Sequence, residues 1–381
     1  MRSTPLPRTE FAVTENLIYL NHAATGVPPR CVQAACAEFL RAQASGGVLG
    51  SFPYELRFAE FRQRIASFVG ARANEIALLR NTSEAANSLA AGLDLRSGDE
   101  VLLPDDEFPA NVLPWLALRS RGVAVRFIET ARERITPDVL RSVMTSRTRV
   151  VALSWVSFAD GYRHDLAALA EVAHERGALL CVDAIQGLGV FPIDVAATGI
   201  DAFYGGGQKW MLALQGIAYL YVTPHLLDRL EVAFPGWRAM ENMWDFLDYD
   251  QRFVADASRF EGGTLNTIGA LSLGVAVEFL AKHDRVAVAE HVLALTDRLA
   301  DGFANAGAVL VSLRGDAISS GIVTCVVPEK DPVEIGRALQ RQGIVTTYRA
   351  SGIRVSPHAY NTFDEIDALL AGLRGLSRVS R

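Results

Sequence analysis

The sequence predicts an α/β protein with a mostly parallel sheet, followed by a smaller α+β domain at the C-terminus. Two observations support this fold class. Between about residue 50 and residue 222, short apolar runs of strand length alternate with segments whose apolar residues recur at helical spacing. The strand-like runs are apolar almost throughout, which is typical of a sheet covered by helices on both faces.

The elements of the first part follow from these two patterns. Helices are expected where apolar side chains recur every three or four residues, namely at Pro53–Val69, Ser83–Leu93, Ala110–Ser120 and Asp165–Arg176. Strands are expected at Glu75–Leu79, Val101–Leu103, Val123–Ile128, Arg149–Ser154, Ala178–Val182, Ala202–Tyr204 and Ile217–Val222.

After about residue 260 the rhythm changes. Two long helices are expected first, and a smaller set of strands and helices follows: Thr267–His283, Arg285–Ala306, Val309–Ser312, Gly321–Val327, Pro332–Gln342, Ile344–Tyr348, Ile353–Ser356 and Thr362–Leu376. We therefore expect an N-terminal arm of residues 1–20, a large domain of residues 21–261 and a small domain of residues 262–381. The first 14 residues hold two prolines and no apolar run, which predicts a loose segment.

Composition narrows the classes of function. Among 381 residues, 37 basic and 43 acidic side chains leave a net charge of −6, which argues against a nucleic acid or an anionic membrane as partner. Apolar runs such as Ile217–Val222 are too short to cross a bilayer, and we find no secretion signal. The four cysteines are scattered without a C-x-x-C pair or a His/Cys cluster, so neither a disulfide framework nor a metal site is expected. These observations together predict a cytoplasmic protein.

Lysine usage singles out one residue. Only three of the 37 basic residues are lysines, at positions 209, 282 and 330, so arginine serves as the ordinary surface cation of this chain. Lys282 and Lys330 stand in polar, turn-like surroundings. Lys209 follows the glycine-rich bend Gly205–Gly207 between apolar residues. Partial burial there would lower the pKa of the amine and favour Schiff-base chemistry, which arginine cannot perform.

Two other loops follow predicted strands, where α/β proteins bind ligands. Arg80–Ala86 offers hydroxyls and free amides that could hold a phosphate, although it is also an ordinary helix cap. Asp183 ends a buried strand. It is either a helix cap or turn residue, or a carboxylate that holds a proton on a heteroaromatic nitrogen. A phosphate site, a carboxylate and the amine of Lys209 are together the parts that bind pyridoxal 5′-phosphate.

At this point the sequence resembles a known family, the class V aminotransferases of fold-type I, which include cysteine desulfurases, kynureninases and isopenicillin-N-epimerase-like proteins. The resemblance implies a mostly parallel sheet of seven strands and pyridoxal 5′-phosphate as cofactor. It covers nearly the whole chain and is carried by short motifs in a specific order: Tyr19–Ala24, Asn81–Ala85, Glu107–Asn111, Asp183–Gln186, Gly206–Trp210, Phe260–Thr267 and Arg354–His358.

The resemblance implies cofactor contacts at matching positions. Lys209 would form the Schiff base and then transfer the α-proton, Asp183 would bind the pyridine nitrogen, and Gln186 would bind the phenolic oxygen. Further contacts are implied for Phe108, which would stack on the ring unless it is a core aromatic, for Ser157 near the phenolic oxygen, and for the phosphate ligands Thr82, Ser83, Gln208 and Thr264. Thr264 would reach the cofactor of a neighbouring subunit, which predicts a homodimer with shared active sites.

Substrate contacts follow from the same resemblance. Arg354 matches the arginine that pairs with the α-carboxylate of an amino acid or amine substrate. Asn21 and His22 lie in a matching motif, and His22 is either a second acid/base group and substrate contact or a structural histidine. Desulfurases carry a nucleophilic cysteine before the arginine, whereas residues 346–353 contain none, which argues against desulfurase activity.

One further departure is Phe158, which stands where desulfurases have an asparagine. Together with Asn21–His22 and the Phe234–Trp237 loop, these changes point to the isopenicillin-N-epimerase-like branch. We expect an aminotransferase first, a C–S or other β-lyase second and an epimerase third. A nucleotide-binding oxidoreductase is the alternative from another class, although Gly205–Gly207 lacks the G-x-G-x-x-G spacing. A partner-binding protein without turnover is a third possibility, against which the retained Lys209 and Asp183 argue.

Overall fold

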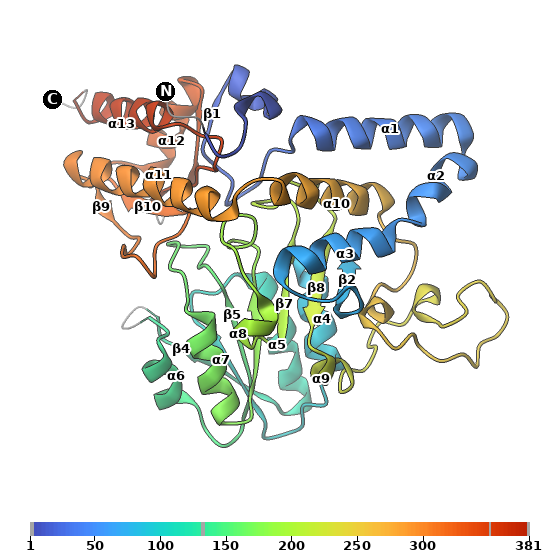
Figure 1. The fold of residues 1–381 in the computed structure, drawn as a ribbon. Coiled ribbons are helices and arrows are strands. Elements are labelled where there is room, and N and C mark those ends of the chain that lie inside the picture. The colour runs from blue at the N-terminus through green and yellow to red at the C-terminus, as the bar shows by residue number, and fades with distance from the viewer. Residues whose placement is uncertain (1–3, 131–133, 350–351, 379–381) are drawn as a thin grey trace.

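The computed structural model describes residues 4–130, 134–349 and 352–378 (Figure 1). Within these residues, the centre is a seven-stranded sheet of order β2-β8-β7-β6-β5-β3-β4. Neighbouring strands are parallel except at β8, which is antiparallel to both β2 and β7. The strands are β2 (Ile76–Leu79), β3 (Glu100–Pro104), β4 (Ala124–Ile128), β5 (Thr148–Ser154), β6 (Leu179–Asp183), β7 (Ala202–Gly206) and β8 (Ala218–Val222). The predicted fold class is confirmed.

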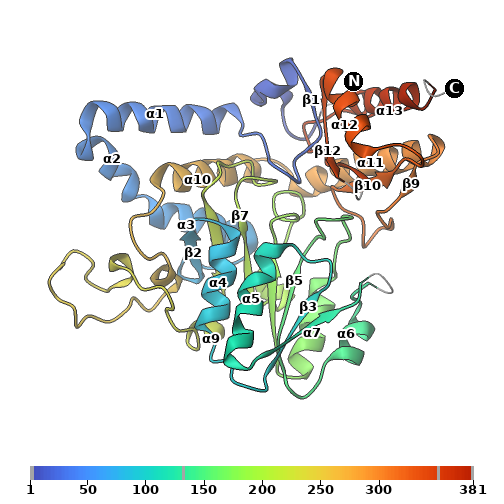
Figure 2. The ribbon, with the colours of Figure 1, turned by 180° about the vertical axis from the view of Figure 1, so that it is seen from behind.

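Helices cover both faces of this sheet, because successive strand residues point to opposite sides and both sides are apolar. Val150 and Cys181 pack into one buried cluster, while Val151 and Leu180 pack into the other. On the Val151 side lie α1 (Arg30–Gly46), α3 (Phe58–Val69), α6 (Pro137–Val143), α7 (Leu166–Glu175), α8 (Val195–Thr198) and α10 (Thr267–Ala281). On the Val150 side lie α4 (Thr82–Gly92), α5 (Leu113–Ala117) and α9 (Pro224–Leu227), as the reverse view shows (Figure 2).

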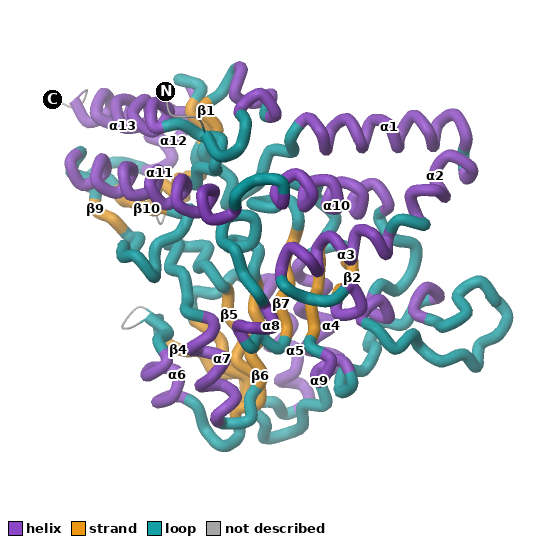
Figure 3. The backbone as a smooth tube through the Cα atoms, viewed as in Figure 1, coloured by secondary structure: helices purple, strands orange, loops and turns teal. Residues whose placement is uncertain are grey.

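The C-terminal part has its own sheet (Figure 3) and its own cluster of buried apolar residues. Its sheet has the order β12-β13-β10-β9 and is antiparallel. The elements are α11 (Arg285–Asn305), β9 (Val309–Leu310), β10 (Val323–Val326), α12 (Pro332–Arg341), β11 (Ile344–Val345), β12 (Thr347–Arg349), β13 (Gly352–Val355) and α13 (Phe363–Arg378). The N-terminal strand β1 (Ile18–Tyr19) joins this part by pairing with β11. The predicted domain limits at residues 20 and 261 stay a prediction.

The N-terminal segment differs from its prediction. From residue 4 onward it is packed on the C-terminal part rather than loose: Leu6 and Phe11 are buried, and Phe11 stacks on Tyr360 with ring centroids 3.9 Å apart. Arg8 donates to the Tyr360 carbonyl oxygen over 2.9 Å. Isolated apolar residues among prolines have no period, so the sequence pattern could not indicate that they are buried.

One predicted helix is divided. Residues 53–69 belong to two helices, α2 (Val48–Glu55) and α3, which are separated at Leu56 and Arg57. Leu56 is 68% exposed, so this leucine of the apolar pattern does not belong to the buried face. Within the described residues, no helix combines the length and the hydropathy that a bilayer crossing requires.

The topology brings the candidate loops together. Strands β2 and β7 point the same way because both are antiparallel to β8, and β3, β5 and β6 are parallel to β7. The carboxyl ends of these five strands therefore meet at one edge of the sheet, where α/β proteins place ligands.

Candidate active site

A cavity of about 340 Å³ opens at this edge, between the loops of the large sheet and strands β12 and β13. Eight residues predicted for the site line it: Thr82, Ser83, Phe108, Asp183, Gln186, Gln208, Lys209 and Arg354. The remaining lining residues are Ala23, Ala24, Asn81, Ala110, Phe158, Ile185 and Arg349. Seven segments that are distant in sequence thus converge on one space.

Lys209 lies in the bend after β7, and its backbone is held in place on both sides. Gly26 N–H donates to the Gln208 carbonyl oxygen over 2.7 Å, and Leu212 N–H donates to that of Lys209 over 3.1 Å. Burial lowers the pKa of the Lys209 amine to about 8, with Arg354 and Arg349 acting in the same direction and Asp183 opposing them. A substantial fraction of the amine is therefore neutral near pH 8 and able to act as a nucleophile or base.

Asp183 is the last residue of β6 and is almost completely buried. Its Oδ1 accepts from the Ile185 N–H over 2.9 Å, while its Oδ2 is buried and has no partner among the described residues. Burial raises the pKa of Asp183 to about 6, which the Ile185 N–H and Lys209 partly offset. A buried carboxylate oxygen without a donor requires an explanation, and a protonated ring nitrogen would supply the missing donor.

The phosphate cradle forms at the start of α4. Asn81 caps this helix, because its side chain accepts from the Glu84 N–H over 2.9 Å. Thr82 follows as the first helical residue, and its Oγ1 is buried without a partner among the described residues. The free N–H groups and the dipole of a helix N-terminus favour an anion, so Thr82 and Ser83 fit a phosphate group.

The ring site lies between these anchors. Phe108 is 37% exposed and faces the Lys209 Nζ, which lies 5.6 Å from its ring centroid. Phe158 meets Phe108 edge to face with centroids 5.2 Å apart. The Gln186 amide donates to the Ala23 carbonyl oxygen over 3.0 Å and accepts from the Trp210 indole over 2.8 Å. An exposed phenyl face, a fixed amide and the unpaired Asp183 oxygen together fit a heteroaromatic ring.

Arg354 reaches the cavity from β13. Its Nη1 donates to the Phe158 carbonyl oxygen over 2.8 Å, and its Nε is buried without a partner among the described residues. Burial lowers the pKa of Arg354 to about 10, and the neighbouring Arg349 adds to this effect. The unpaired donor and the two adjacent positive charges make this wall suited to a carboxylate.

Four predicted residues do not line the cavity. His22 is completely buried, with Nδ1 3.1 Å from the Ser356 carbonyl oxygen and Nε2 2.9 Å from the Tyr360 hydroxyl. The Asn21 side chain accepts from the Thr347 hydroxyl, and the Ser157 hydroxyl accepts from the Ala159 N–H over 3.3 Å. Their roles stay predictions.

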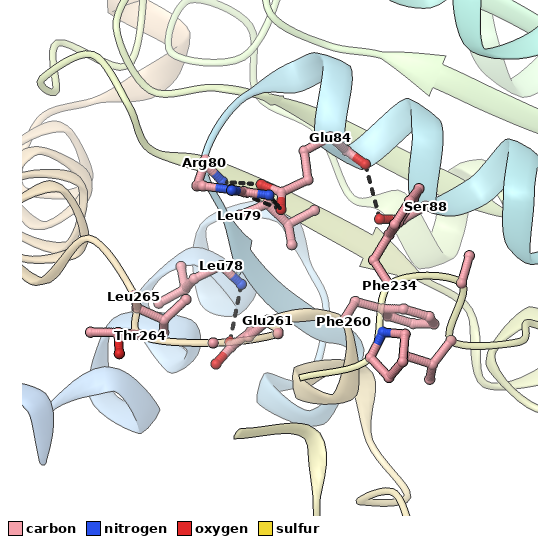
Figure 4. A pocket seen from close by; sticks show the side chains of 15 residues that line it. Leu78, Leu79, Arg80, Glu84, Ser88, Phe234, Phe260, Glu261, Thr264 and Leu265 are labelled. Atoms are coloured by element: carbon pink, nitrogen blue, oxygen red, sulfur yellow. Dashed lines mark hydrogen bonds and ion pairs between the residues drawn. The ribbon is translucent and has the colours of Figure 1, made fainter. Parts of the chain in front are cut away.

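Thr264 lies in a separate pocket of about 290 Å³ (Figure 4). Glu261 of the same segment accepts from the Leu78 N–H over 3.1 Å, and Arg80 and Glu84, which also line this pocket, form an ion pair with each other. Thr264 does not line the cavity that contains Lys209 of the same subunit. This position agrees with a contact to the cofactor of a neighbouring subunit, and that contact stays a prediction.

Sequence reasoning assigned no role to three residues at or beside the cavity. Arg349 lines it, and Trp210 holds Gln186. Glu107 accepts from the Phe108 N–H over 2.7 Å and from the Ser154 N–H over 2.6 Å. Burial, with the nearby charge of Asp183, raises the pKa of Glu107 to about 7. The sequence shows a tryptophan directly after the lysine and an acid after an apolar strand. Their hydrogen-bond partners are distant in sequence, so the sequence alone could not indicate these contacts.

Comparisons with known proteins show the family and the fold of this chain. The family profile described as aminotransferase class V matches residues 18–369. A probable cysteine desulfurase of Methanothermobacter thermautotrophicus is 29% identical over 386 residues, covering 95% of each chain. The apo cysteine desulfurase of Thermococcus onnurineus NA1 superposes with a TM-score of 0.90 at 24% identity, covering 99% of each chain. The cystine C–S lyase C-DES, in complex with its reaction product cysteine persulfide, has a TM-score of 0.88 at 22% identity and covers 96% of this chain and 99% of its own.

These relatives correct the predicted order of activities. Aminotransfer was expected first, and desulfurase activity was argued against because residues 346–353 contain no cysteine. That order is wrong, since the named relatives are enzymes of carbon–sulfur cleavage. β-Elimination releases the substrate sulfur as a thiol or sulfide and needs no protein cysteine, so the absence of a cysteine from residues 346–353 does not argue against a carbon–sulfur lyase.

Proposed function

This chain belongs to the class V aminotransferase family, and on that premise we propose that it is a pyridoxal 5′-phosphate-dependent lyase that cleaves a carbon–sulfur bond in cysteine or in an amino acid derived from it. One observation carries the proposal. Lys209 lies in the bend after β7, Asp183 ends β6 and Arg354 belongs to β13, and all three line a single cavity. An amine, a carboxylate and a carboxylate-binding cation are the minimum set for chemistry at the α-carbon of an amino acid.

The cofactor is pyridoxal 5′-phosphate. When bound, it supplies an aldehyde that condenses with amines and a ring that takes up the electrons released at the substrate α-carbon. The groups left unpaired fit its outline: the Asp183 Oδ2 for the ring nitrogen, and the Thr82 Oγ1 with the start of α4 for the phosphate. Gln208 and Ser83, which also line the cavity, would add phosphate contacts.

Lys209 is assigned the proton transfers. Its amine has a pKa of about 8, so it can accept the proton that leaves the α-carbon and return it to the departing sulfur. Arg354 would hold the α-carboxylate through those guanidinium N–H groups that do not donate to the Phe158 carbonyl oxygen. Phe108 and Phe158 give the cavity an apolar wall, which excludes water from the ring and suits a sulfur side chain.

The resemblance also supports a homodimer in which Thr264 of one subunit completes the site of the other. We further expect a cytoplasmic location and an amino acid or small amine as substrate.

The test follows the sulfur. Purified protein is supplied with pyridoxal 5′-phosphate and either cysteine or cystine, and sulfide, persulfide, alanine, pyruvate and ammonia are measured. We expect sulfur release that requires the cofactor and is lost in Lys209→Ala. Alanine indicates desulfuration, in which the thiol of a second cysteine molecule takes up the sulfur as a persulfide. Pyruvate with ammonia indicates β-elimination, and both outcomes support C–S cleavage. Transfer of the amino group to a keto acid without sulfur release would overturn the proposal.

A further inference from the structure

The amide of Gln186 has a single allowed orientation. Its Nε2 donates to the Ala23 carbonyl oxygen over 3.0 Å, and its Oε1 accepts from the Trp210 Nε1 over 2.8 Å. An indole N–H can only donate and a carbonyl oxygen can only accept. A reversed amide would therefore set two donors against each other and two acceptors against each other, at a side chain that is only 2% exposed. Trp210 thus decides which end of the amide is the donor.

Trp210 itself cannot turn away. It is completely buried, and a Cβ at Gly321 would overlap the edge of its indole ring. Its carbonyl oxygen lies 3.1 Å from the His358 Nε2, and its ring lies 5.6 Å from that of His358 and 6.0 Å from that of His22. The indole is therefore held by residues of the C-terminal part and by His22, while its N–H points to Gln186 in the loop after β6.

The oriented amide keeps one free donor. Of the two N–H bonds on the Gln186 Nε2, one is directed to Ala23, and the other is left over for an acceptor. Gln186 lines the cavity, where the structure places Lys209 and Asp183 as well. An oxygen substituent of a bound heteroaromatic ring is an acceptor of the right kind, whereas a rotated amide would offer it a repelling carbonyl.

We propose that Trp210 is a positioning residue for the cofactor: its indole N–H fixes the Gln186 amide so that the remaining N–H is presented to the ring oxygen of bound pyridoxal 5′-phosphate. This inference rests on the proposed function. The same stretch of backbone then carries both the reacting amine of Lys209 and the group that orients the amide.

Trp210→Phe removes the indole N–H and keeps an aromatic ring. We expect the dissociation constant of pyridoxal 5′-phosphate to rise about tenfold, as for the loss of one hydrogen bond, and the visible absorption of the bound cofactor to shift. The matched control is Trp115→Phe in α5, because Trp115 is also completely buried and also donates to an amide oxygen, that of Asn111 over 3.4 Å, and neither residue lines the cavity. Trp115→Phe should lower thermal stability but leave cofactor affinity and spectrum unchanged.

A double-mutant cycle separates positioning from packing. If Trp210 acts through Gln186, Trp210→Phe should weaken cofactor binding in the wild type but not in Gln186→Ala. Equal losses in both backgrounds, or an unchanged affinity and spectrum in Trp210→Phe, would overturn the inference. Should Trp210→Phe fail to fold, Gln186→Glu keeps an acceptor for Trp210 and removes the donor, so it must bind the cofactor more weakly. A glutamate variant with wild-type affinity would contradict the proposal.

These outcomes distinguish a failure of the proposed function from a failure of the proposed role of Trp210. A wild-type protein that does not bind pyridoxal 5′-phosphate defeats the proposed function. A wild-type protein that binds it while Trp210→Phe behaves identically defeats only the role of Trp210.

Discussion

At the scale of single residues, burial brings the acid–base groups of the cavity toward neutral pH. Burial lowers the pKa of the Lys209 amine to about 8 and raises that of Asp183 to about 6, and each charge partly opposes the shift of the other. These shifts reflect the cost of placing a charge away from water. A site that must both hold a proton on a ring and exchange one with substrate needs groups in this range.

The rate at which the Lys209 amine reacts with pyridoxal 5′-phosphate should therefore depend on pH according to the pKa of this amine. In cofactor-free protein, we expect the rate of covalent attachment to rise with pH and to be half-maximal near pH 8, because only the neutral amine is nucleophilic. Asp183→Asn removes the charge that raises this pKa, so the midpoint should move to lower pH. Attachment is followed by absorbance after rapid mixing, with Lys209→Ala as the blank. A midpoint near the ordinary lysine value of 10.5 would contradict the burial argument.

Arg354 should be more than a positive charge. Arg354→Lys keeps the cation but loses the planar fork, so we expect kcat/KM for cysteine to fall about 10- to 100-fold, as for the loss of one charge-assisted hydrogen bond. Cysteamine, which lacks the carboxylate, is the control substrate, and its kcat/KM should change little. If both substrates lose the same factor, Arg354 does not bind the carboxylate.

The sequence predicted the reactive residues of the cavity better than the residues that fix their neighbours in position. Lys209 was singled out by the scarcity of lysine and Asp183 by its place after a strand, and both line the cavity. Trp210 and Glu107 were given no role, because their hydrogen-bond partners Gln186 and Ser154 are far away in sequence, and Arg349 was one arginine among many. A hydrogen bond such as that between Trp210 and Gln186 leaves no local pattern.

At the scale of elements, the lysine bend is shaped by close backbone contacts. The loop before α1 passes so near that a Cβ at Gly26 would overlap the Lys209 carbonyl oxygen. The regular strands were predicted to within about two residues, because a buried strand is apolar throughout. Helix α1 was not predicted, since only Val32, Cys36 and Phe39 of its 17 residues are buried and the rest give little apolar signal.

Gly26→Ala should consequently disturb the site more than the fold. The added methyl group must push the Lys209 backbone away, so we expect the affinity for pyridoxal 5′-phosphate to fall at least about tenfold. Gly46→Ala at the end of α1 is the matched control, because nothing lies within 4 Å of its Cβ. That change should leave the affinity unchanged and stabilise the helix by up to about 1 kcal/mol. The two affinities come from fluorescence titration, and equal values would refute the contact.

At the scale of the whole molecule, several large apolar side chains are exposed to solvent. Trp244, Phe246, Leu247 and Tyr249 are each more than half exposed on the projecting loop between α9 and α10 (Figure 1), and Leu49 of α2 is 83% exposed. Large exposed apolar patches usually mark an interface. This surface and the position of Thr264 outside its own cavity both support the proposed homodimer.

Mixed dimers test whether the sites are shared. Lys209→Ala and Thr264→Val subunits are purified separately, mixed under exchange conditions and assayed at a cofactor concentration that leaves Thr264→Val mostly empty. If Thr264 acts across the interface, the hybrid has one site with both residues intact, and random mixing should restore about a quarter of wild-type activity. The control pair is Lys209→Ala with Arg354→Ala. Both of these residues line the cavity of one subunit, so neither hybrid site is intact and no activity should return. Recovery no greater than the sum of the separate variants would show that Thr264 does not complete the partner's site.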